Sequence, residues 1–180
     1  MSPDGVLTPP PTAADFPALR AMAAQASDAQ GMADLDACLD GAGEHGGGCD
    51  RAPLTGFGWA GRIAWPHTAH SPRIKAAVAW YGRLEGEAPA HQPRFPIDRV
   101  GDLKAPVLGP YGEVDQSIPL DSVERMRHAL ERAAVSTDIV VYSTAQNGFH
   151  SDNRTSYQRA AAEHGWAAMT GWFSTYGVRP

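Results

Sequence analysis

A short glycine-rich segment contains the first residues whose spacing suggests chemistry. Residues 56–61 read Gly-Phe-Gly-Trp-Ala-Gly, so Gly56, Gly58 and Gly61 match the G-x-G-x-x-G pattern of dinucleotide-binding loops. The segment also fits a nucleophile elbow, G-x-nucleophile-x-G, a strained turn between a strand and a helix that lifts one side chain above a sheet. In that second interpretation Gly58 stands where the nucleophile belongs, with small residues on both sides.

Two features weigh against dinucleotide binding. An acidic residue should end the next strand to hold the ribose, but that strand ends Trp80-Tyr81-Gly82 and the next carboxylate is Glu85. A bulky Trp59 also stands where bare backbone should approach a pyrophosphate. The elbow is therefore favoured, although the residues alone leave both interpretations open.

The histidines could serve as metal ligands or as a base. His67 and His70 are three residues apart on an expected helix, and His150 stands two residues before Asp152. A metal site needs three or four converging ligands, and the sequence identifies no such set, so neither a metal nor a cofactor is predicted.

The two cysteines, Cys38 and Cys49, do not belong to any CxxC pattern. Cys49 lies in a glycine-rich stretch near Arg51 and could be a reactive thiol. Cys38 lies near Leu35 and Leu39 and is predicted to be a core residue. Two thiols outside any CxxC pattern form no disulfide framework, so a reducing cytoplasm is the expected location.

Periodicity predicts the elements that position these residues. A helical pattern begins at Asp15, with a break expected at Gly31, and residues 41–50, which contain five glycines, are predicted to be a loop. Further helices are expected at residues 59–70, 119–134 and 156–176, and strands at residues 52–57, 74–81, 105–111 and 138–142. Nearly all-apolar strands that alternate with helices predict an α/β fold with a parallel sheet flanked by helices.

Composition narrows the functions and the domain count. The chain has 180 residues with 43% hydrophobic and 19% charged residues, which suits one globular domain. A net charge of -5 and the lack of any long apolar stretch argue against nucleic-acid and membrane partners. Residues 1–14, with three consecutive prolines, are predicted to be a disordered lead, and residues 15–180 to be the single domain.

Several blocks of sequence resemble the dienelactone hydrolase family. The segment TGFGWAGRIAW, Thr55–Trp65, resembles the family's elbow, usually written GFCWGG, whose cysteine is the nucleophile. Four further blocks follow in the family's order: Ile74–Leu84, Ala105–Pro119, Ile139–Asp152 and Ser156–Phe173. The resemblance covers roughly residues 30–177. It implies an α/β-hydrolase fold and hydrolysis of dienelactones or other small carboxylic esters by a Cys, an Asp and a His.

The resemblance also assigns positions to the catalytic residues. The triad acid falls on Asp115, but the cysteine position holds Gly58 and the histidine position holds Asn147. Glycine has no side chain that could attack an ester, and an amide is no base at neutral pH. Four residues are expected to line the pocket and bind substrate: Trp59, Tyr111, Phe149 and His150. Arg62 is interpreted as a helix-surface residue.

Two more departures from the family pattern shape the expectations. Pro66 lies inside the helix after the elbow, where it should kink or end that helix. The family's first strands and first helix have no counterpart in residues 1–29, so the domain is expected to be partial, with an unpaired edge at Pro53–Phe57.

These departures lead to a functional expectation. By resemblance the chain is a hydrolase of small carboxylic esters or enol-lactones, with little or no activity expected unless His150 or Cys49 substitutes for the missing groups. The alternative is a non-catalytic remnant that binds a small ester or carboxylate, or a partner, including a second copy at the open sheet edge. Dinucleotide binding through Gly56, Gly58 and Gly61 ranks behind both.

Overall fold

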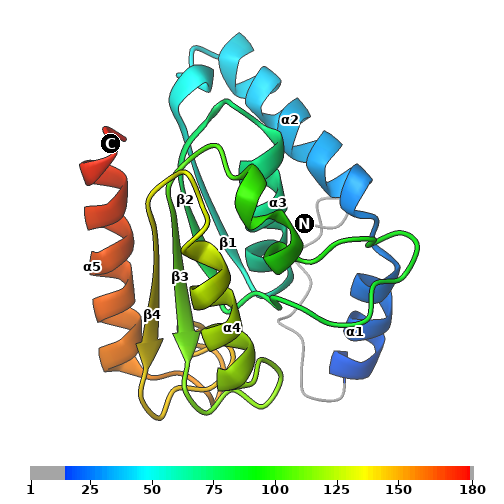
Figure 1. Ribbon diagram of the computed structural model, residues 1–180, viewed down its shortest axis with the longest axis vertical. Coiled ribbons are helices and arrows are strands. Elements are labelled where there is room, and N and C mark those ends of the chain that lie inside the picture. The colour runs from blue at the N-terminus through cyan, green and yellow to red at the C-terminus, as the bar shows by residue number, and fades with distance from the viewer. Residues whose placement is uncertain (1–14, 179–180) are drawn as a thin grey trace.

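The computed structural model describes residues 15–178, so the predicted lead at residues 1–14 lies outside the described part (Figure 1). The α-helices are α1 (Phe16–Gln25), α2 (Asp28–Glu44), α3 (Trp59–His70), α4 (Leu120–Leu130) and α5 (Arg159–Thr175). The strands are β1 (Ala52–Phe57), β2 (Ile74–Trp80), β3 (Val107–Gly112) and β4 (Thr137–Tyr142). Two 3-10 segments, η2 (Cys49–Arg51) and η3 (Pro96–Asp102), complete the order.

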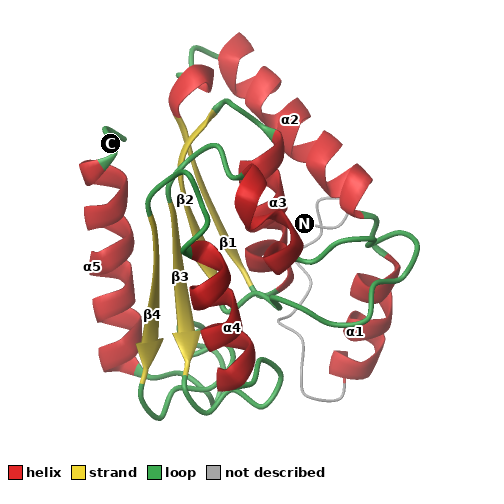
Figure 2. Ribbon diagram, viewed as in Figure 1, coloured by secondary structure: helices red, strands yellow, loops and turns green. Residues whose placement is uncertain are grey.

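The strands form one parallel sheet in the order β1-β2-β3-β4, which confirms the predicted fold class (Figure 2). Helices α3 and α4 cover one face, and α5 returns along the other (Figure 1). A parallel connection must cross over the sheet, and right-handed crossovers in one direction place successive helices on the same face. Helix α2 packs on the outer side of α3 and extends that layer.

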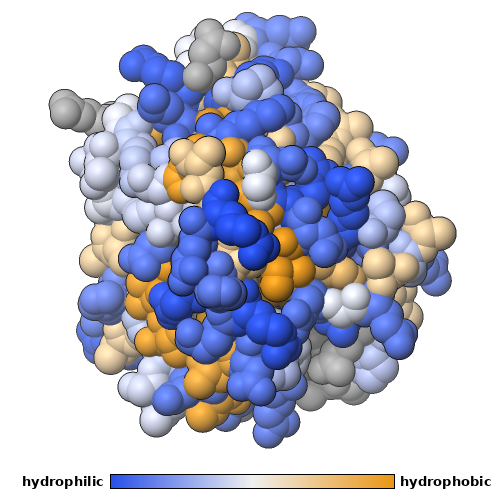
Figure 3. Space-filling model, in the orientation of Figure 1, coloured by the Kyte–Doolittle hydropathy of each residue, from blue (hydrophilic) through white to orange (hydrophobic). Residues whose placement is uncertain are grey.

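The core lies between the sheet and these helices. Strand β2 is buried at every position except Lys75, as expected for a strand covered on both faces. The largest side chains that lose all contact with solvent include Trp65, Trp80, Tyr111 and Phe149. The face drawn in Figure 3 is mostly hydrophilic, with smaller hydrophobic areas at its centre and lower left. No helix within residues 15–178 has both the length and the apolar character that a bilayer crossing requires.

Three local predictions at the N-terminal helices were wrong. The break lies at residues 26–27 instead of at Gly31, because Ser27 caps α2 by accepting a hydrogen bond from the backbone N–H of Gln30 at 3.4 Å. Helix α2 then continues to Glu44, well into the stretch predicted as loop. Cys38 is exposed on α2 and is therefore no core residue.

Pro66 does not end its helix, since α3 runs from Trp59 to His70. A proline inside a helix forfeits one hydrogen bond to the carbonyl four residues earlier, which here belongs to Arg62. Residues 61–69 are all buried in the layer between α2 and the sheet, and this packing outweighs the lost bond. Tertiary burial thus overrides a strong local signal.

The predicted open edge is at β1. Within the described residues β1 pairs with β2 alone, and its register shifts between Ala52 and Pro53. Proline lacks the N–H that a central strand needs, so its presence suits an edge strand. Pro53, Thr55 and Phe57 are exposed on the face of the sheet that carries α5.

Candidate functional site

Gly58 alone forms the turn between β1 and α3. Its φ of +58° and ψ of -115° lie in a region that residues with a Cβ rarely adopt, which is the strained geometry of a nucleophile elbow. A Cβ added at Gly58 would meet no atom within 4 Å. The turn therefore has the shape that presents a side chain, and it has room for one, but glycine supplies none.

The two flanking glycines are explained by packing. A Cβ at Gly56 would lie 2.4 Å from the carbonyl oxygen of Ala60, and one at Gly61 would lie 2.3 Å from the carbonyl oxygen of Trp80. Both positions therefore let α3 approach the sheet closely. The G-x-G-x-x-G spacing needs no phosphate ligand to account for it.

Asp115 is a buried carboxylate in the loop after β3, with only 4% of its surface exposed. Its Oδ1 accepts hydrogen bonds from the backbone N–H of Ser117 at 2.8 Å, from the Ser117 hydroxyl at 2.7 Å and from the N–H of Ile118 at 3.1 Å. Its Oδ2 accepts one from Nδ2 of Asn147 at 2.9 Å. Every acceptor oxygen is therefore satisfied, as the burial of a charge requires.

Three positions singled out in the sequence lie at one edge of the sheet. Gly58 follows β1, Asp115 follows β3 and Asn147 follows β4, and the carboxyl ends of parallel strands share an edge. Gly58 and Asn147 line the same cavity, and Asp115 reaches it through Asn147. In open α/β sheets this edge is where ligands bind.

The cavity at this edge has a volume of about 450 Å³, which suits a small molecule. Its wall is formed by Ala24, Gly58, Trp59, Arg62, Tyr81, Arg83, Glu87, Pro89, Gln92, Phe95, Ser117, Ile118 and Asn147. Of the four predicted pocket residues only Trp59 belongs to this wall. Sequence reasoning missed the contribution of residues 83–95, which follow β2 without any periodicity that would mark them.

The other three predicted pocket residues lie elsewhere. Tyr111 is fully buried inside β3, where burial raises the pKa of its hydroxyl and Trp65 Nε1 donates a hydrogen bond to that oxygen at 3.3 Å. Phe149 is fully buried with its ring 5.0 Å from that of Tyr142. Both belong to the core, since both are fully buried and neither lines the cavity.

His150 joins a group of aromatic rings on the α5 side of the sheet. Its ring lies 4.8 Å from Trp80, 5.3 Å from Phe57 and 5.7 Å from Trp166. It is not among the residues that line the cavity. The expected role in substrate binding therefore has no support in its position.

Arg62 is no surface residue, because only 3% of it is exposed. Its guanidinium forms a two-pronged ion pair with Asp28, with Nη1–Oδ1 at 2.5 Å and Nη2–Oδ2 at 3.0 Å. Nη2 also donates to the backbone carbonyl of Arg94 at 3.1 Å, and the guanidinium lies 4.8 Å from the ring centre of Phe95. Arg62 thereby ties the start of α2 and the segment after β2 to α3.

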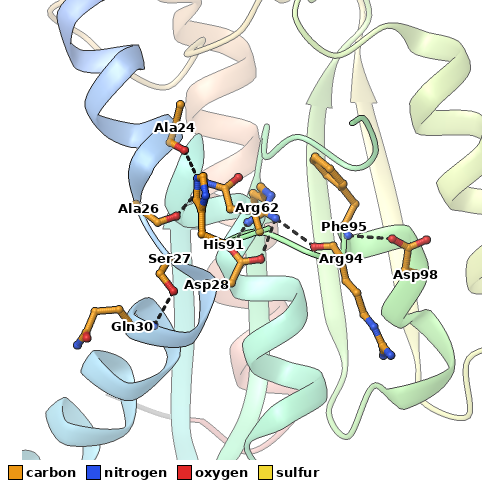
Figure 4. Close-up of polar contacts among 11 residues, drawn as sticks. Ala24, Ala26, Ser27, Asp28, Gln30, Arg62, His91, Arg94, Phe95 and Asp98 are labelled. Carbon is orange, nitrogen blue, oxygen red and sulfur yellow. Dashed lines mark hydrogen bonds and ion pairs between the residues drawn. The ribbon is translucent and has the colours of Figure 1, made fainter. Parts of the chain in front are cut away.

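The turn between α1 and α2 is fastened to the same segment (Figure 4). His91 Nε2 donates to the carbonyl of Ala24, and Gln92 Nε2 donates to the carbonyl of Ala26 at 2.9 Å. The backbone N–H of Asp28 donates to the carbonyl of His91 at 3.0 Å. One side of the cavity is therefore built from three segments that are remote in sequence.

The remaining candidates from the sequence lie away from the cavity. Cys49 begins η2 at the amino end of β1, so the strand's length, about 20 Å at roughly 3.3 Å per residue, separates it from the turn at Gly58. His67 and His70 face α2, where Asp36 Oδ2 lies 3.0 Å from His70 Nε2. Across residues 15–178 no group of three or more His, Cys, Asp or Glu side chains could hold a metal ion.

Comparison with known proteins relates this geometry to a family. The sequence profile described as "Dienelactone hydrolase family" matches residues 8–177. A protein of Escherichia coli O157:H7 named "Putative carboxymethylenebutenolidase" is 48% identical over 165 residues, which cover 91% of this chain and 61% of the relative. A protein of the same name in Methylorubrum extorquens is 48% identical over 152 residues, covering 84% of this chain and 52% of the relative.

Comparison with solved structures points to the same family and fold. The crystal structure of a "Putative Dienelactone Hydrolase" from Klebsiella pneumoniae superposes with a TM-score of 0.83 at 49% identity, covering 85% of this chain and 64% of that one. Esterase 2 of Thermogutta terrifontis, at 17% identity and a TM-score of 0.68, covers 86% of this chain and 66% of its own, and shares the fold alone. The chain thus spans about 61% of the length of the first curated relative.

Proposed function

From the premise that this chain belongs to the dienelactone hydrolase family and has its α/β-hydrolase fold, we propose that it binds a small carboxylic ester or carboxylate without hydrolysing it. The ligand occupies the cavity beside Gly58. One observation carries the proposal: Gly58 has the positive-φ turn of an elbow and open space where a side chain would lie, but it offers no nucleophile.

The chemistry of ester hydrolysis explains why turnover is not expected. A nucleophile must attack the acyl carbon while a base takes up its proton and later returns it. Gly58 contributes no attacking atom, and the Asn147 amide accepts no proton at neutral pH. Asp115 cannot compensate, because its two oxygens already accept four hydrogen bonds.

Several features support retained binding. The cavity is large enough for a small molecule and combines the aromatic surface of Trp59 with polar groups. Helix α3 begins at Trp59, directly beside the cavity, and the backbone N–H groups of a first helical turn lack partners within the helix. Such N–H groups attract carboxylate and carbonyl oxygens.

Calorimetric titration with a small enol-lactone and with its ring-opened carboxylate tests binding, and release of p-nitrophenol from p-nitrophenyl acetate tests turnover. Trp59→Ala should weaken binding, whereas Trp166→Ala removes an exposed tryptophan outside the cavity wall and should not. Turnover above an Asp115→Ala control contradicts the proposal, and so does the failure of both ligands to bind.

Hydrolysis remains the second candidate, because the relatives bear the name of an ester-cleaving enzyme and Asp115 keeps its hydrogen bond to the residue at the base position. It requires a substitute nucleophile. Cys49→Ser and His150→Gln variants test the two substitutes suggested by the sequence, and a loss of turnover in either would identify the group responsible.

A further inference from the structure

The orientation of Asn147 determines which of its atoms a ligand meets. Asp115 Oδ2 is a carboxylate oxygen and can only accept, so the side-chain NH₂ of Asn147 must face it, at 2.9 Å. The same Nδ2 lies 3.5 Å from the carbonyl oxygen of Tyr81. Tyr81, which provides that carbonyl, has an unusual positive φ of +33°. Both N–H bonds of the amide are thus directed at protein oxygens.

The side-chain oxygen of Asn147, Oδ1, is therefore the amide atom that is available to a ligand. Asn147 is half-buried and belongs to the cavity wall, and its Oδ1 has no hydrogen-bond donor among the described residues. An ester or a lactone offers only acceptors to such an atom. A hydroxyl group on the ligand could donate to it, so the base position favours a ligand with an O–H.

Arg83 supplies a positively charged hydrogen-bond donor, in contrast to the acceptor oxygen of Asn147. Its guanidinium lies beside Gly86, where an added Cβ would come within 2.8 Å of Nη2, and 5.7 Å from the ring centre of Phe95. It lines the cavity, yet no carboxylate of residues 15–178 lies within ion-pair distance of it. Arg62, the other arginine of the wall, is by contrast occupied by Asp28.

We infer that the cavity selects a small hydroxycarboxylate, with the carboxylate on Arg83 and the hydroxyl donating to Oδ1 of Asn147. The inference rests on the proposed function and narrows its ligand from esters and carboxylates in general to the chemical class that ring opening of a lactone produces. Arg83 and Asn147 act here as specificity residues. Glu87, which also lines the cavity, repels a second negative charge and so favours a monoanion.

Four matched ligands test the inference by calorimetry on the unaltered chain: 4-hydroxybutanoate, its methyl ester, 4-methoxybutanoate and γ-butyrolactone. The methyl ester lacks the charge, the methoxy acid lacks the donor, and the lactone lacks both. We expect 4-hydroxybutanoate to bind about tenfold more tightly than either singly altered ligand, since one charged or buried hydrogen bond has about that effect. Its affinity should also fall with added salt, because Arg83 is exposed.

Variants then test whether Arg83 is the residue that binds the ligand carboxylate. Arg83→Met should reduce the affinity for 4-hydroxybutanoate to that of its methyl ester and leave the ester unaffected, while Arg83→Lys should retain part of the preference. Arg132→Met, which removes an exposed arginine outside the cavity wall, is the matched control. The hydroxyl is tested through the ligand, because replacing Asn147 would leave Asp115 Oδ2 without its donor.

The outcomes separate this inference from the proposed function. Equal affinity for all four ligands, or a preference for the lactone, overturns the hydroxycarboxylate assignment while binding without turnover still stands. A preference for 4-hydroxybutanoate that Arg83→Met leaves intact overturns the role of Arg83. If none of the four ligands binds, both the inference and the proposed function fail.

Discussion

Glycine at position 58 relieves the elbow of strain that any other residue would incur. A φ of +58° combined with a ψ of -115° costs a residue with a Cβ on the order of 1–3 kcal/mol, and enzymes with an elbow bear that cost in order to present a nucleophile. Here the cost is absent together with the side chain. Asp115 nevertheless accepts a hydrogen bond from Asn147, the residue at the predicted base position.

Restoring the missing groups tests how complete this arrangement is. The double substitution Gly58→Cys and Asn147→His should give esterase activity that stays about 10²–10³-fold below that of a full-length relative assayed alongside, the effect of one missing oxyanion donor. An α/β-hydrolase takes one such donor from the loop after an early strand, and the four-stranded sheet described here includes no such loop. Initial rates with p-nitrophenyl acetate provide the comparison. Turnover equal to that of the relative would disprove the argument.

The bond between Asp115 and Asn147 should matter for stability. Asn147→Leu leaves the buried Oδ2 of Asp115 without a donor, and we expect the free energy of unfolding to fall by about 1–3 kcal/mol. Urea denaturation followed by circular dichroism measures the change. Glu113→Gln changes an exposed residue of the same loop and should have little effect. If both variants lose the same free energy of unfolding, the hydrogen bond between Asp115 and Asn147 has no particular importance for stability.

At the scale of elements, the cavity depends on how α1 and α2 are held against α3. Helix α2 makes few contacts with the rest of the fold beyond α3 and η2, so specific polar contacts carry much of its attachment. The ion pair of Asp28 and Arg62 and the hydrogen bonds from His91 and Gln92 join the turn between α1 and α2 to the segment after β2. The wall around Ala24 therefore exists only while this attachment holds.

Breaking the buried ion pair should loosen this wall. Asp28→Asn leaves Arg62 buried with an unpaired charge, which typically costs about 3–5 kcal/mol. Asp40 lies on the same helix as Asp28, and Asp40→Asn breaks its pair with Arg73 in the turn before β2. Because Asp40 is exposed, the expected loss is at most about 1 kcal/mol. Thermal unfolding compares the two variants, and equal losses would contradict the structural role of Asp28. Hydrogen exchange at residues 91–95 should increase in Asp28→Asn alone.

The interface of α2 and α3 should also make stability depend on pH. His67 is fully buried there, and burial lowers its pKa below the ordinary 6.5; Asp36 opposes this shift, while His70 and Arg73 reinforce it. The unfolded chain therefore binds a proton near pH 6.5 that the folded chain resists. This contribution to stability is fully present above pH 6.5 and declines as the pH falls below that value.

A histidine variant isolates this effect. Unfolding free energies measured between pH 5 and pH 8 should show a weaker decline in acid for His67→Leu than for the unaltered chain. His128→Gln, which removes an exposed histidine of α4, should leave the decline unchanged. If the unfolding free energy of His67→Leu falls in acid as steeply as that of the unaltered chain, groups other than His67 cause the decline.

At the scale of the molecule, the two edge strands of the sheet differ in their protection against pairing with another chain. Strand β4 carries the exposed charge of Asp138, and Arg127 donates to the carbonyl of Ile139 at 2.9 Å. Strand β1 contains no charged residue and, within the described residues, pairs on one side alone. Charged side chains are a common protection against pairing with another chain. Apart from Pro53 and the register shift beside it, β1 lacks such protection, and we propose that the chain associates with a second copy through this edge.

Sedimentation velocity over a range of concentrations tests this association. We expect a dimer to form as the concentration rises, and the amides of β1 to gain protection from hydrogen exchange in the same range. The amides of β4 serve as the internal control and should be unaffected. A species that stays monomeric at high concentration, or protection gained at β4 instead, would contradict the proposal.

The sequence by itself determined the strands, the parallel sheet, the elbow at Gly58 and the order of Asp115 and Asn147 along the chain. These features are local: apolar runs specify buried strands, glycines specify the turn, and the carboxyl ends of parallel strands always meet at one edge. Even the pair of Asp115 and Asn147 followed from family blocks that survive as short contiguous segments.

Only the tertiary structure decided which residues surround that edge. The partners Asp28 and Arg62 are 34 residues apart, and His91 contacts Ala24 across 67 residues, so no local period encodes them. The loop that contributes Arg83 has no regular pattern of burial, and Tyr111 is withdrawn into the core although it lies next to the site in sequence. A cavity is a property of packing between distant segments, and its walls become known only when those segments are brought together.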